Sequence, residues 1–444
     1  MKKVITYGTY DLFHKGHYNL LRNAKALGDY LIVGVTSSDF DKNRGKLNVR
    51  DSLMTRIKHV EETGFADEII IEEYFGQKID DIKKYDIDIF TVGSDWKGHF
   101  DYLSEYCEVI YLDRTKGISS TDIRNTKSIK LGLWGFSDIT TRFIDESKFV
   151  SGIDIEYIYS DSSDTLDSST LAEYDLERKD DIEEFYESVD AVYIVEKPQN
   201  QYNAIMQALM HKKHVLVEFP ILVTNSQINE IIELAIQNQC IFMEGLKTAY
   251  TPAFNKLVTT AKSGIIGNIL NVEANFTQIL GKQIQNQIQL VNGGSVNALA
   301  SYSFLAFVKL LGLDYKSIQF FSRMNEEQID IFTKVLITYE NSIGASMVAI
   351  DAKSEGELVV AGDKGYIYVP APWWKTEYFE VRFEDINQNR KYFYKFDGEG
   401  LRYEISEFIQ AILNQKHSIL LTHDEIKAII KLLNMYTSKN IIKF

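Results

Sequence analysis

The stretch Val4 to His17, VITYGTYDLFHKGH, predicts a strand that passes through a tight turn into a helix. Val4 to Tyr7 is a β-branched and aromatic run that ends at Gly8, and apolar residues recur at helical spacing from about Lys15. A strand that feeds a helix in this way presents backbone N–H groups and the positive end of the helix dipole to a bound anion. The stretch therefore predicts a phosphate-binding turn.

Two histidines lie at the start of the predicted helix, three residues apart. His14 and His17 would both face the bound anion from the first helical turn. Imidazole donates a hydrogen bond to a phosphate oxygen near neutral pH, and two imidazoles stabilise charge on a phosphoryl group in transfer. For an isolated His-x-Gly-His tetrad, a zinc-ligand pair or an ordinary surface turn is the alternative.

Composition favours a protein that acts on a small molecule. The 444 residues predict two to three domains, and the net charge of -15 argues against nucleic-acid or membrane-surface partners. Only Cys107 and Cys240 are present, so no disulfide framework is expected. No apolar signal region precedes the first strand, and no run has membrane-spanning length, which predicts a cytoplasmic protein without membrane insertion.

Apolar runs alternate with helical patterns through the first domain. This alternation predicts a parallel sheet wound with helices, which binds its ligands at the carboxyl ends of the strands. The predicted strands are Val4–Tyr7, Tyr30–Val35, Glu68–Ile71, Ile87–Val92 and Val109–Leu112.

The segment from Asp41 to Lys58 is locally basic in an acidic chain. A solvated loop explains such a run, but this one follows the second strand on the predicted ligand edge. We therefore predict that Arg44, Lys46 and Arg56 hold phosphate.

Three segments together resemble the nucleotidyltransferase superfamily of the cytidylyltransferases, and most closely the bacterial glycerol-3-phosphate cytidylyltransferases. They are Gly8-Thr9-Tyr10-Asp11 with the histidine tetrad, Gly93 to Asp101, and Arg114-Thr115-Lys116-Gly117-Ile118-Ser119-Ser120-Thr121. The resemblance runs from Met1 to about Lys127. Tyr10 stands where Phe is common in the family, and Lys15 where Trp is common.

The resemblance implies cytidylyl transfer from CTP to a small polyol phosphate. Glycerol 3-phosphate leads, followed by glycerol 2-phosphate and ribitol phosphate, and the product would serve a cell-surface polymer such as teichoic acid or capsule. A superfamily member that uses ATP, or that accepts a choline- or ethanolamine-like substrate, is the alternative. A homodimer or a higher homo-oligomer is expected.

The resemblance also assigns roles to residues. Asp11 would hold Mg²⁺ or orient a histidine, and Ser119 to Thr121 would otherwise be an ordinary helix cap. The implied catalytic residues are His14, His17, Arg114 and Lys46; the implied nucleotide-binding residues are Thr9, Tyr10, Asp11, Arg56, Asp95, Thr115, Gly117, Ile118, Ser119, Ser120 and Thr121.

A second strand-and-helix alternation begins after a polar stretch, 122–128. We predict an α/β chain: a Rossmann-like nucleotidyltransferase domain (1–127), a second Rossmann-like domain (128–250), and an α+β domain with a large, mainly antiparallel sheet (251–444). The predicted elements are strands at Lys130–Leu133, Ile155–Ser160, Asp190–Val195, His214–Glu218 and Ile241–Gly245, a β-rich region from Ile269 to Tyr368 and a helical tail from Tyr403 to Lys439.

The region from about Ile129 onward is similar to the glucose-fructose oxidoreductase, inositol dehydrogenase and dihydrodiol dehydrogenase family. The resemblance rests on the order of several short motifs, which are Glu218-Phe219-Pro220, Phe242-Met243-Glu244-Gly245, Tyr250 to Phe254, Gly264 with Gly267, Gly293-Gly294, and Gly362 to Gly365 before Trp373-Trp374.

The dinucleotide turn of that family is altered in this chain. The family pattern is G-x-G-x-x-G, whereas residues 135–140 read GFSDIT, so Ser137 and Thr140 replace two small residues and Asp138 adds negative charge. Gly135, Ser137 and Asp161 are the candidate NAD(P)-binding residues. For Asp161, an ordinary loop aspartate is the alternative.

The family's catalytic residues are also incomplete here. Phe219 stands where the family has lysine, Ala298 aligns with an aspartate, and Tyr302 holds the position of the acid. A tyrosine without a lysine nearby is a poor acid–base group near pH 7. Glu218 and Tyr302 are therefore predicted to be a vestigial redox site in a dimerisation, regulatory or binding module. An active NAD(P)-dependent reductase that supplies the polyol phosphate is the alternative.

Overall fold

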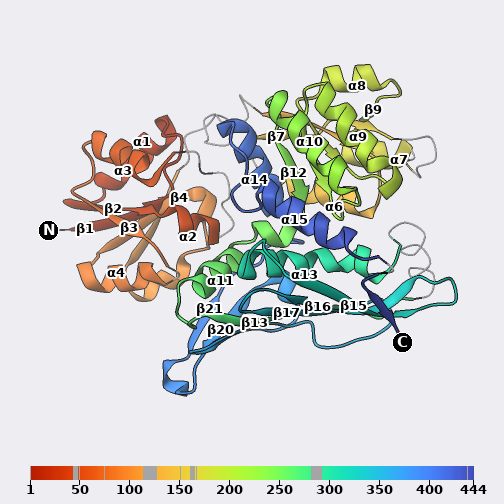
Figure 1. The fold of residues 1–444 in the computed structure, drawn as a ribbon. Coiled ribbons are helices and arrows are strands. Elements are labelled where there is room, and N and C mark those ends of the chain that lie inside the picture. The colour runs from red at the N-terminus through yellow and green to blue at the C-terminus, as the bar shows by residue number, and fades with distance from the viewer. Residues whose placement is uncertain are drawn as a thin grey trace. The chain divides into compact units, whose positions relative to one another are not determined.

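The computed structural model describes residues 2–43, 49, 51–74, 76–113, 128–150, 152–160, 166, 168–281, 293–437 and 439–444. The chain folds into two compact units, Met1–Ser128 and Ile129–Phe444 (Figure 1). The further division of the second unit at residue 250 stays a prediction.

The first unit is a parallel sheet with the strand order β3-β2-β1-β4-β5. This confirms the predicted α/β fold. Its elements are β1 (Lys3–Gly8), α1 (Lys15–Lys25), β2 (Tyr30–Thr36), α2 (Ser38–Asn43), α3 (Leu53–Glu62), β3 (Glu68–Glu72), α4 (Gln77–Tyr85), β4 (Ile89–Gly93), η1 (Ser94–Trp96), η2 (Asp101–Glu105) and β5 (Glu108–Leu112).

Successive residues of β1 enter two different cores. Val4 packs with residues of α1 and α3, including Leu21 and Val60, on one face of the sheet. Ile5 packs with Ile82 of α4 on the other face. Because side chains alternate along a strand, a central strand buried on both faces is apolar throughout, as the run Val4 to Tyr7 is.

The second unit begins with another parallel sheet, in the order β12-β11-β10-β6-β8-β9, with β7 paired to β6. Its elements are β6 (Ile129–Trp134), α6 (Asp138–Ser147), β7 (Ile153–Asp154), β8 (Tyr157–Tyr159), α7 (Ser168–Tyr174), β9 (Glu177–Arg178), α8 (Ile182–Ser188), β10 (Ala191–Ile194), α9 (Pro198–Met210), β11 (His214–Glu218), α10 (Asn225–Gln237) and β12 (Phe242–Gly245).

A larger sheet follows in the order β21-β20-β19-β18-β13-β17-β16-β15-β22, with β14 beside β17. It is mainly antiparallel, as predicted, although β13 runs parallel to β17 and β15 parallel to β22. Its elements are η3 (Lys247–Tyr250), α11 (Pro252–Lys262), β13 (Ile269–Ala274), β14 (Phe276–Thr277), α13 (Ser295–Leu311), β15 (Ser317–Met324), β16 (Asp330–Thr338), β17 (Ile343–Ala349), β18 (Leu358–Gly362), β19 (Tyr366–Val369), η4 (Trp373–Lys375), β20 (Tyr378–Arg382), η5 (Ile386–Gln388) and β21 (Arg390–Phe393).

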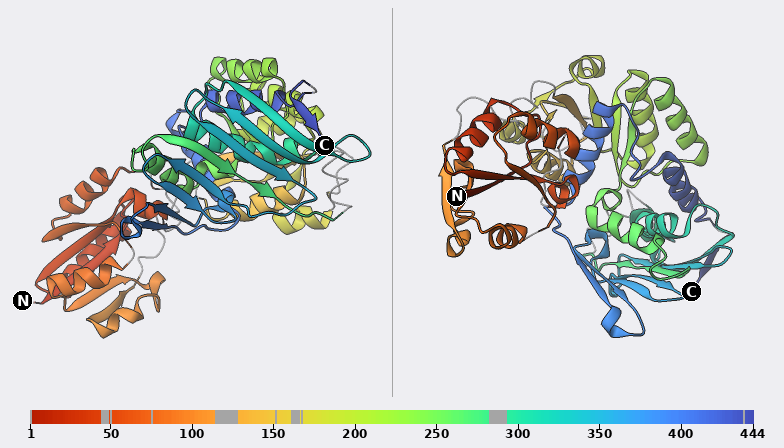
Figure 2. Two further views of the ribbon diagram at one scale, coloured as in Figure 1. Left: turned by 60° about the horizontal axis from the view of Figure 1, so that its bottom comes forward. Right: turned by 90° about the vertical axis from the view of Figure 1, so that its left-hand side faces the viewer.

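Helix α13 covers one face of this sheet, against β13, β16 and β17, and the left view of Figure 2 shows the strands in front of the helices of the second unit. None of the helices in the described residues is long and apolar enough to cross a membrane.

The helical tail predicted from Tyr403 to Lys439 is helical in two parts. The segment forms α14 (Leu401–Asn414) and α15 (His423–Asn434), followed by β22 (Ile441–Lys443), which joins the edge of the large sheet. Gln415 adopts a left-handed backbone (φ 51°) and ends α14. A heptad-like run of apolar residues does not show where a single residue leaves helical geometry, so the break was not predicted.

Candidate functional site

The histidine turn lies at the switch point of the first sheet. In the order β3-β2-β1-β4-β5, the chain builds outward from β1 in one direction and then from β4 in the other. Parallel sheets bind ligands outside the carboxyl ends of their strands at this point. The turn after β1 leads into α1, and β4 leads directly into η1.

The turn between β1 and α1 has an unusual backbone. Tyr10 (φ 55°) and Leu12 (φ 47°) both adopt left-handed conformations, which are uncommon outside glycine. The Tyr10 ring is buried beneath Gly8, where an added Cβ would lie 2.9 Å from the ring. Gly8 is therefore needed for the close approach of the ring to the strand end.

His14 is the N-cap of α1. Its Nδ1 accepts a hydrogen bond from the Gly16 N–H at 3.0 Å, so the neutral ring carries its proton on Nε2, which is a hydrogen-bond donor. The rings of His14 and His17 stack, with centroids 3.9 Å apart. The structure thus brings the two predicted histidines together at a helix N-terminus, where an anion is favoured.

Thr9 and Asp11 flank the Tyr10 ring and are both buried. The Thr9 hydroxyl donates to Asp41 at 2.9 Å, and Asp11 Oδ1 accepts the Asp51 N–H at 2.8 Å. Both predicted nucleotide-binding residues therefore lie in the histidine turn, tied to the segment that follows β2.

Arg56 lies at the carboxyl ends of β1 and β2. Its side chain is fully buried, and its guanidinium donates to the carbonyl oxygens of Thr9 and Thr36 at 2.8 Å each. It also forms an ion pair with Asp41 at 3.3 Å. These contacts fasten α3 to the ends of β1 and β2, and the role of Arg56 in holding a phosphate stays a prediction. A basic run in the sequence does not distinguish a buried arginine from an exposed one.

Several predicted residues lie outside the described part of the chain. Asp95 lies in η1, directly after β4, but its side chain is not among those described. Arg44, Lys46, Arg114, Thr115, Gly117, Ile118, Ser119, Ser120, Thr121 and Asp161 lie outside the described residues.

A cation that no sequence motif marks lies near the same edge of the sheet. Lys78 of α4 forms an ion pair with the buried Glu72 at the end of β3, and its ammonium lies 4.6 Å from the centroid of the Tyr7 ring. An isolated lysine in an amphipathic helix carries no signal in the sequence that would mark it.

In the second unit, Gly135 follows β6 with φ 86°, and an added Cβ would lie 2.0 Å from the Val195 carbonyl oxygen. Ser137 and Thr140, which replace the second and third small residues of the family pattern, cap the start of α6. The Thr140 hydroxyl accepts the Ser137 N–H at 3.1 Å, and Thr140 is fully buried. The first glycine of the predicted dinucleotide turn is thus required by packing alone.

Two buried carboxyl groups interact in the second unit, Glu218 at the end of β11 and Glu404 on α14. The Tyr193 hydroxyl donates to Glu218, and burial raises the pKa of Glu218 to about 7, against the effect of that hydrogen bond and of Lys247. Burial and the charge of Glu218 raise the pKa of Glu404, whose carboxyl oxygens have no hydrogen-bond partner among the described residues.

The predicted redox pair lies close to this cluster. The Phe219 ring packs edge-to-face on Tyr302, and Phe276 packs on Tyr302 from another direction. Burial raises the pKa of the Tyr302 hydroxyl, and the charges of Glu218 and Glu404 raise it further. The structure brings Glu218 and Tyr302 near each other in an apolar, acidic setting that keeps the phenol protonated.

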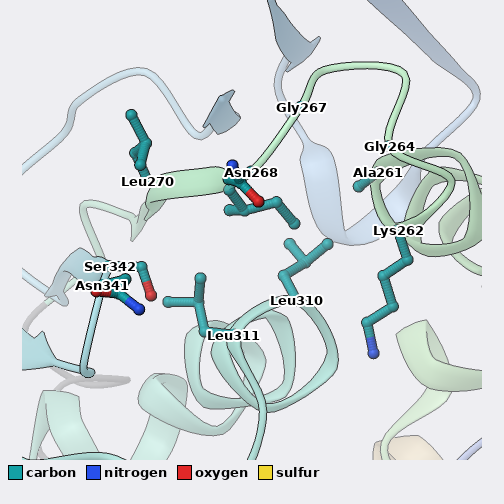
Figure 3. A pocket seen from close by; sticks show the side chains of 11 residues that line it. Ala261, Lys262, Gly264, Gly267, Asn268, Leu270, Leu310, Leu311, Asn341 and Ser342 are labelled. Carbon is teal, nitrogen blue, oxygen red and sulfur yellow. The ribbon is translucent and has the colours of Figure 1, made fainter. Parts of the chain in front are cut away.

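A separate cavity of about 660 Å³ lies between the C-terminal ends of α11 and α13 (Figure 3). Lys262 borders it at one end, Asn341 and Ser342 border it at the other, and Leu310 and Leu311 lie between them. The residues predicted for dinucleotide binding or redox chemistry are not among those that line it.

Residues 5–126 match the family model described as cytidylyltransferase-like. The glycerol-3-phosphate cytidylyltransferase of Bacillus spizizenii is 55% identical over 124 residues, which cover 28% of this chain and 95% of that protein. This chain belongs to the cytidylyltransferase family. This match confirms the family predicted from the histidine turn. Membership of this family makes the protein a nucleotidyltransferase.

The part of the chain that follows the cytidylyltransferase domain matches a second family. Residues 129–246 match the model described as an oxidoreductase family with an NAD-binding Rossmann fold. A trans-1,2-dihydrobenzene-1,2-diol dehydrogenase of Bos taurus is 25% identical over 251 residues, which cover 54% of this chain and 75% of that protein. KijD10, a 3-ketoreductase from Actinomadura kijaniata solved with NADP and TDP-benzene, aligns with 71% of this chain and 99% of its own at a TM-score of 0.63 and 19% identity. The cytidylyltransferase domain is therefore fused to an oxidoreductase domain of the Gfo/Idh/MocA type.

Proposed function

We propose that the first unit transfers the cytidylyl group of CTP to glycerol 3-phosphate, giving CDP-glycerol and pyrophosphate. The observation that carries this proposal is the stacked pair His14 and His17 at the N-terminus of α1, at the switch point of the sheet. The acceptor is proposed from the relative of 55% identity, which is named for glycerol 3-phosphate.

In this reaction a phosphate oxygen of the acceptor attacks the α-phosphorus of CTP in line. A new O–P bond forms, the bond between the α-phosphorus and its bridging oxygen breaks, and pyrophosphate leaves. The protein's task is to position two anions and to stabilise charge on the α-phosphate. Because His14 Nδ1 accepts the Gly16 N–H, the donor that the neutral ring presents is its Nε2–H, which we propose bonds a phosphate oxygen. His17, stacked on it, is proposed to bond the neighbouring phosphate.

Asp11 is the residue proposed to contact Mg²⁺. A carboxylate buried in the phosphate-binding turn fits this ion, which binds proteins through one or two carboxylates and completes its shell with phosphate and water. When bound, Mg²⁺ neutralises phosphate charge. The remaining nucleotide contacts are proposed for Thr9, Tyr10, Asp95 and, with Lys46, the segment from Arg114 to Thr121.

Lys78 is a further candidate for holding the acceptor phosphate. Its ammonium lies over Tyr7, whose next residue is Gly8 at the end of β1. Its ammonium is paired with the buried Glu72, so a phosphate bound there would share the ammonium with that carboxylate. Glycerol 2-phosphate and ribitol phosphate remain the next acceptors to compare.

For the second unit we propose a binding or regulatory module without redox catalysis. Phe219 stands where the family's lysine is expected, and the Tyr302 hydroxyl is buried among acidic groups rather than beside a cation. The matched family is described as NAD-binding, so NAD(P) is the dinucleotide to test. A cytoplasmic location, a homo-oligomer, and use of the product in a surface polymer are also proposals.

Pyrophosphate release tests the proposed activity. We expect turnover with CTP and glycerol 3-phosphate, and little with ATP or with phosphocholine and phosphoethanolamine. His14→Ala and His17→Ala should each lower kcat about 10²- to 10³-fold, because each removes a donor to the reacting phosphates. His211→Ala, in the second unit, is the matched control. Turnover with ATP alone, or full activity in the double histidine variant, would refute the proposal.

A further inference from the structure

The histidine turn needs support from outside its own sequence. Tyr10 and Leu12, four and two residues before His14, both hold left-handed backbone conformations. Each such residue is strained by about 1–3 kcal/mol and persists only when its surroundings hold it in place. The position of His14 and His17 therefore depends on whatever fixes this backbone.

Asp51 makes three hydrogen bonds, two of which hold the backbone of the histidine turn. Its carboxylate Oδ2 accepts the Leu12 N–H at 2.9 Å, and its own N–H donates to Asp11 Oδ1 at 2.8 Å. Its carbonyl oxygen accepts the Nε–H of the buried Arg56 at 3.1 Å. Asp51 thus pairs reciprocally with two consecutive residues of the turn, although it lies about forty residues further along the chain.

A second line of contacts leads from Asp51 to His17. His59 of α3 has its Nδ1 at 4.0 Å from Asp51 Oδ2. The Phe13 ring lies between the two imidazoles, with centroids 5.8 Å from His59 and 5.5 Å from His17. Asp51 therefore contacts the backbone of the turn, and His59 contacts the ring of Phe13 beside it.

We propose that Asp51 is a positioning residue for cytidylyl transfer, which holds the strained β1–α1 turn so that His14 and His17 meet the phosphates of the nucleotide. His59 supports it through Phe13. The inference rests on the proposed function of the two histidines, but it concerns residues that the sequence motifs do not include.

Kinetics of the full chain give the first test. Asp51→Ala removes the acceptor for the Leu12 N–H, so we expect kcat to fall about 10- to 100-fold, since misplacement of catalytic groups by about 1 Å can cost 10²-fold. The KM for CTP should change less than kcat. Asp51→Asn keeps an oxygen of the same reach and should restore kcat to within about threefold of the wild type, since it keeps that geometry.

A matched control is available in the same unit. Asp88 Oδ2 accepts the Lys3 N–H at 2.7 Å at the start of β1, the opposite end of the strand from the histidine turn. Asp88→Ala removes the same kind of bond and should leave kcat unchanged.

Histidine resonances separate positioning from general stability. In NMR spectra of the full chain with labelled histidine, Asp51→Ala should shift the imidazole signals of His14 and His17. The signals of His211, His214, His417 and His423, all in the second unit, should stay in place. Should Asp51→Ala fail to fold, Asp51→Ser, whose hydroxyl is too short to reach Leu12, carries the same expectations.

The outcomes are distinct. Unchanged kcat and unchanged His14 and His17 signals in Asp51→Ala, with activity lost in His14→Ala, would overturn this inference and leave the proposed function intact. An Asp51→Asn variant as impaired as Asp51→Ala would also overturn it, because geometry would then not be what matters. Activity retained in His14→Ala and His17→Ala would refute the proposed function itself.

Discussion

The ring of Phe219 lies edge-on against the ring of Tyr302, with their centroids 4.9 Å apart. A lysine at position 219 would place an ammonium beside the phenol and favour its ionised form. The aromatic ring does the opposite, because it excludes water without supplying charge. Tyr302 thus keeps its proton near neutral pH, in line with the burial that raises its pKa.

This arrangement predicts that the wild-type chain does not oxidise NADH or NADPH with ketone phosphates such as dihydroxyacetone phosphate. Cofactor absorbance at 340 nm measures the reaction, with an active dehydrogenase in the same assay as the positive control. Cofactor binding is a separate question. A nucleotide bound at a hundredfold excess over Kd adds about 2.7 kcal/mol to stability, which a thermal shift detects.

Oxidation of the cofactor by the wild-type chain, abolished in Tyr302→Phe, would show that the unit is an active reductase. A thermal shift without oxidation would instead indicate a dinucleotide-binding module.

The histidine turn and both parallel sheets could be predicted because each has a local signal. Val4 to Tyr7 is apolar because β1 is buried on both faces, and His14 meets His17 because the first is the N-cap of α1 and the second lies in its first turn. The glycine after β6 is required by the close approach of Val195.

The contacts that hold the site could not be predicted from local patterns. Arg56 and Asp51 act on residues about forty positions away, and nothing in a single sequence states which distant carbonyl a buried arginine meets. The predicted tail is divided by residues 415–422, where α14 ends at the left-handed Gln415 and α15 begins after the N-cap Thr422.

The raised pKa of the Glu244 carboxyl predicts that the stability of the second unit depends on pH. Burial, together with the charge of Glu218, raises its pKa from 4.5 to about 8, against the lowering effect of a hydrogen bond from the Ile221 backbone. The folded chain therefore binds more protons than the unfolded chain between these values. The stability that this group contributes is complete below about pH 4.5 and is lost as the pH rises through about 8.

Glu244→Gln should remove this dependence. Since one pKa unit corresponds to about 1.4 kcal/mol, we expect the stability of the variant relative to the wild type to increase by about 2–4 kcal/mol from pH 5 to pH 8.5. Urea unfolding by tryptophan fluorescence measures it in a Trp96→Phe background, which leaves Trp134, Trp373 and Trp374, all in the second unit. Glu233→Gln, at an exposed position on α10, is the control. Parallel pH profiles of Glu244→Gln and wild type would contradict the prediction.

A buried ion pair between Arg402 and Glu146 joins the C-terminal helices to the parallel-sheet part of the second unit. The guanidinium of Arg402 on α14 donates to both carboxylate oxygens of Glu146 on α6, at 2.8 and 3.0 Å, across 256 residues of chain. Their side chains are only 12% and 9% exposed, and the guanidinium also covers the ring of Phe149 at 4.2 Å.

Breaking this pair should be costly, because the remaining charge stays buried. Removal of one partner of a buried pair typically costs about 3–5 kcal/mol, and slight exposure reduces this, so we expect Arg402→Met to lower the free energy of unfolding by about 2–4 kcal/mol. Arg402→Lys keeps the charge but loses the two-pronged geometry and should cost about 1–2 kcal/mol. The same fluorescence assay measures both variants.

An exposed ion pair at the C-terminal end of α6 is the matched control for the buried pair. Lys148 and Asp145 lie 2.7 Å apart, but their side chains are 61% and 56% exposed, so Lys148→Ala should cost less than about 0.5 kcal/mol. A double-mutant cycle with Glu146→Met then isolates the interaction, since the double variant leaves no unpaired charge and should be less destabilised than the sum of the single variants. Additive single effects would mean that α14 is held by its apolar face alone and that the ion pair contributes nothing of its own.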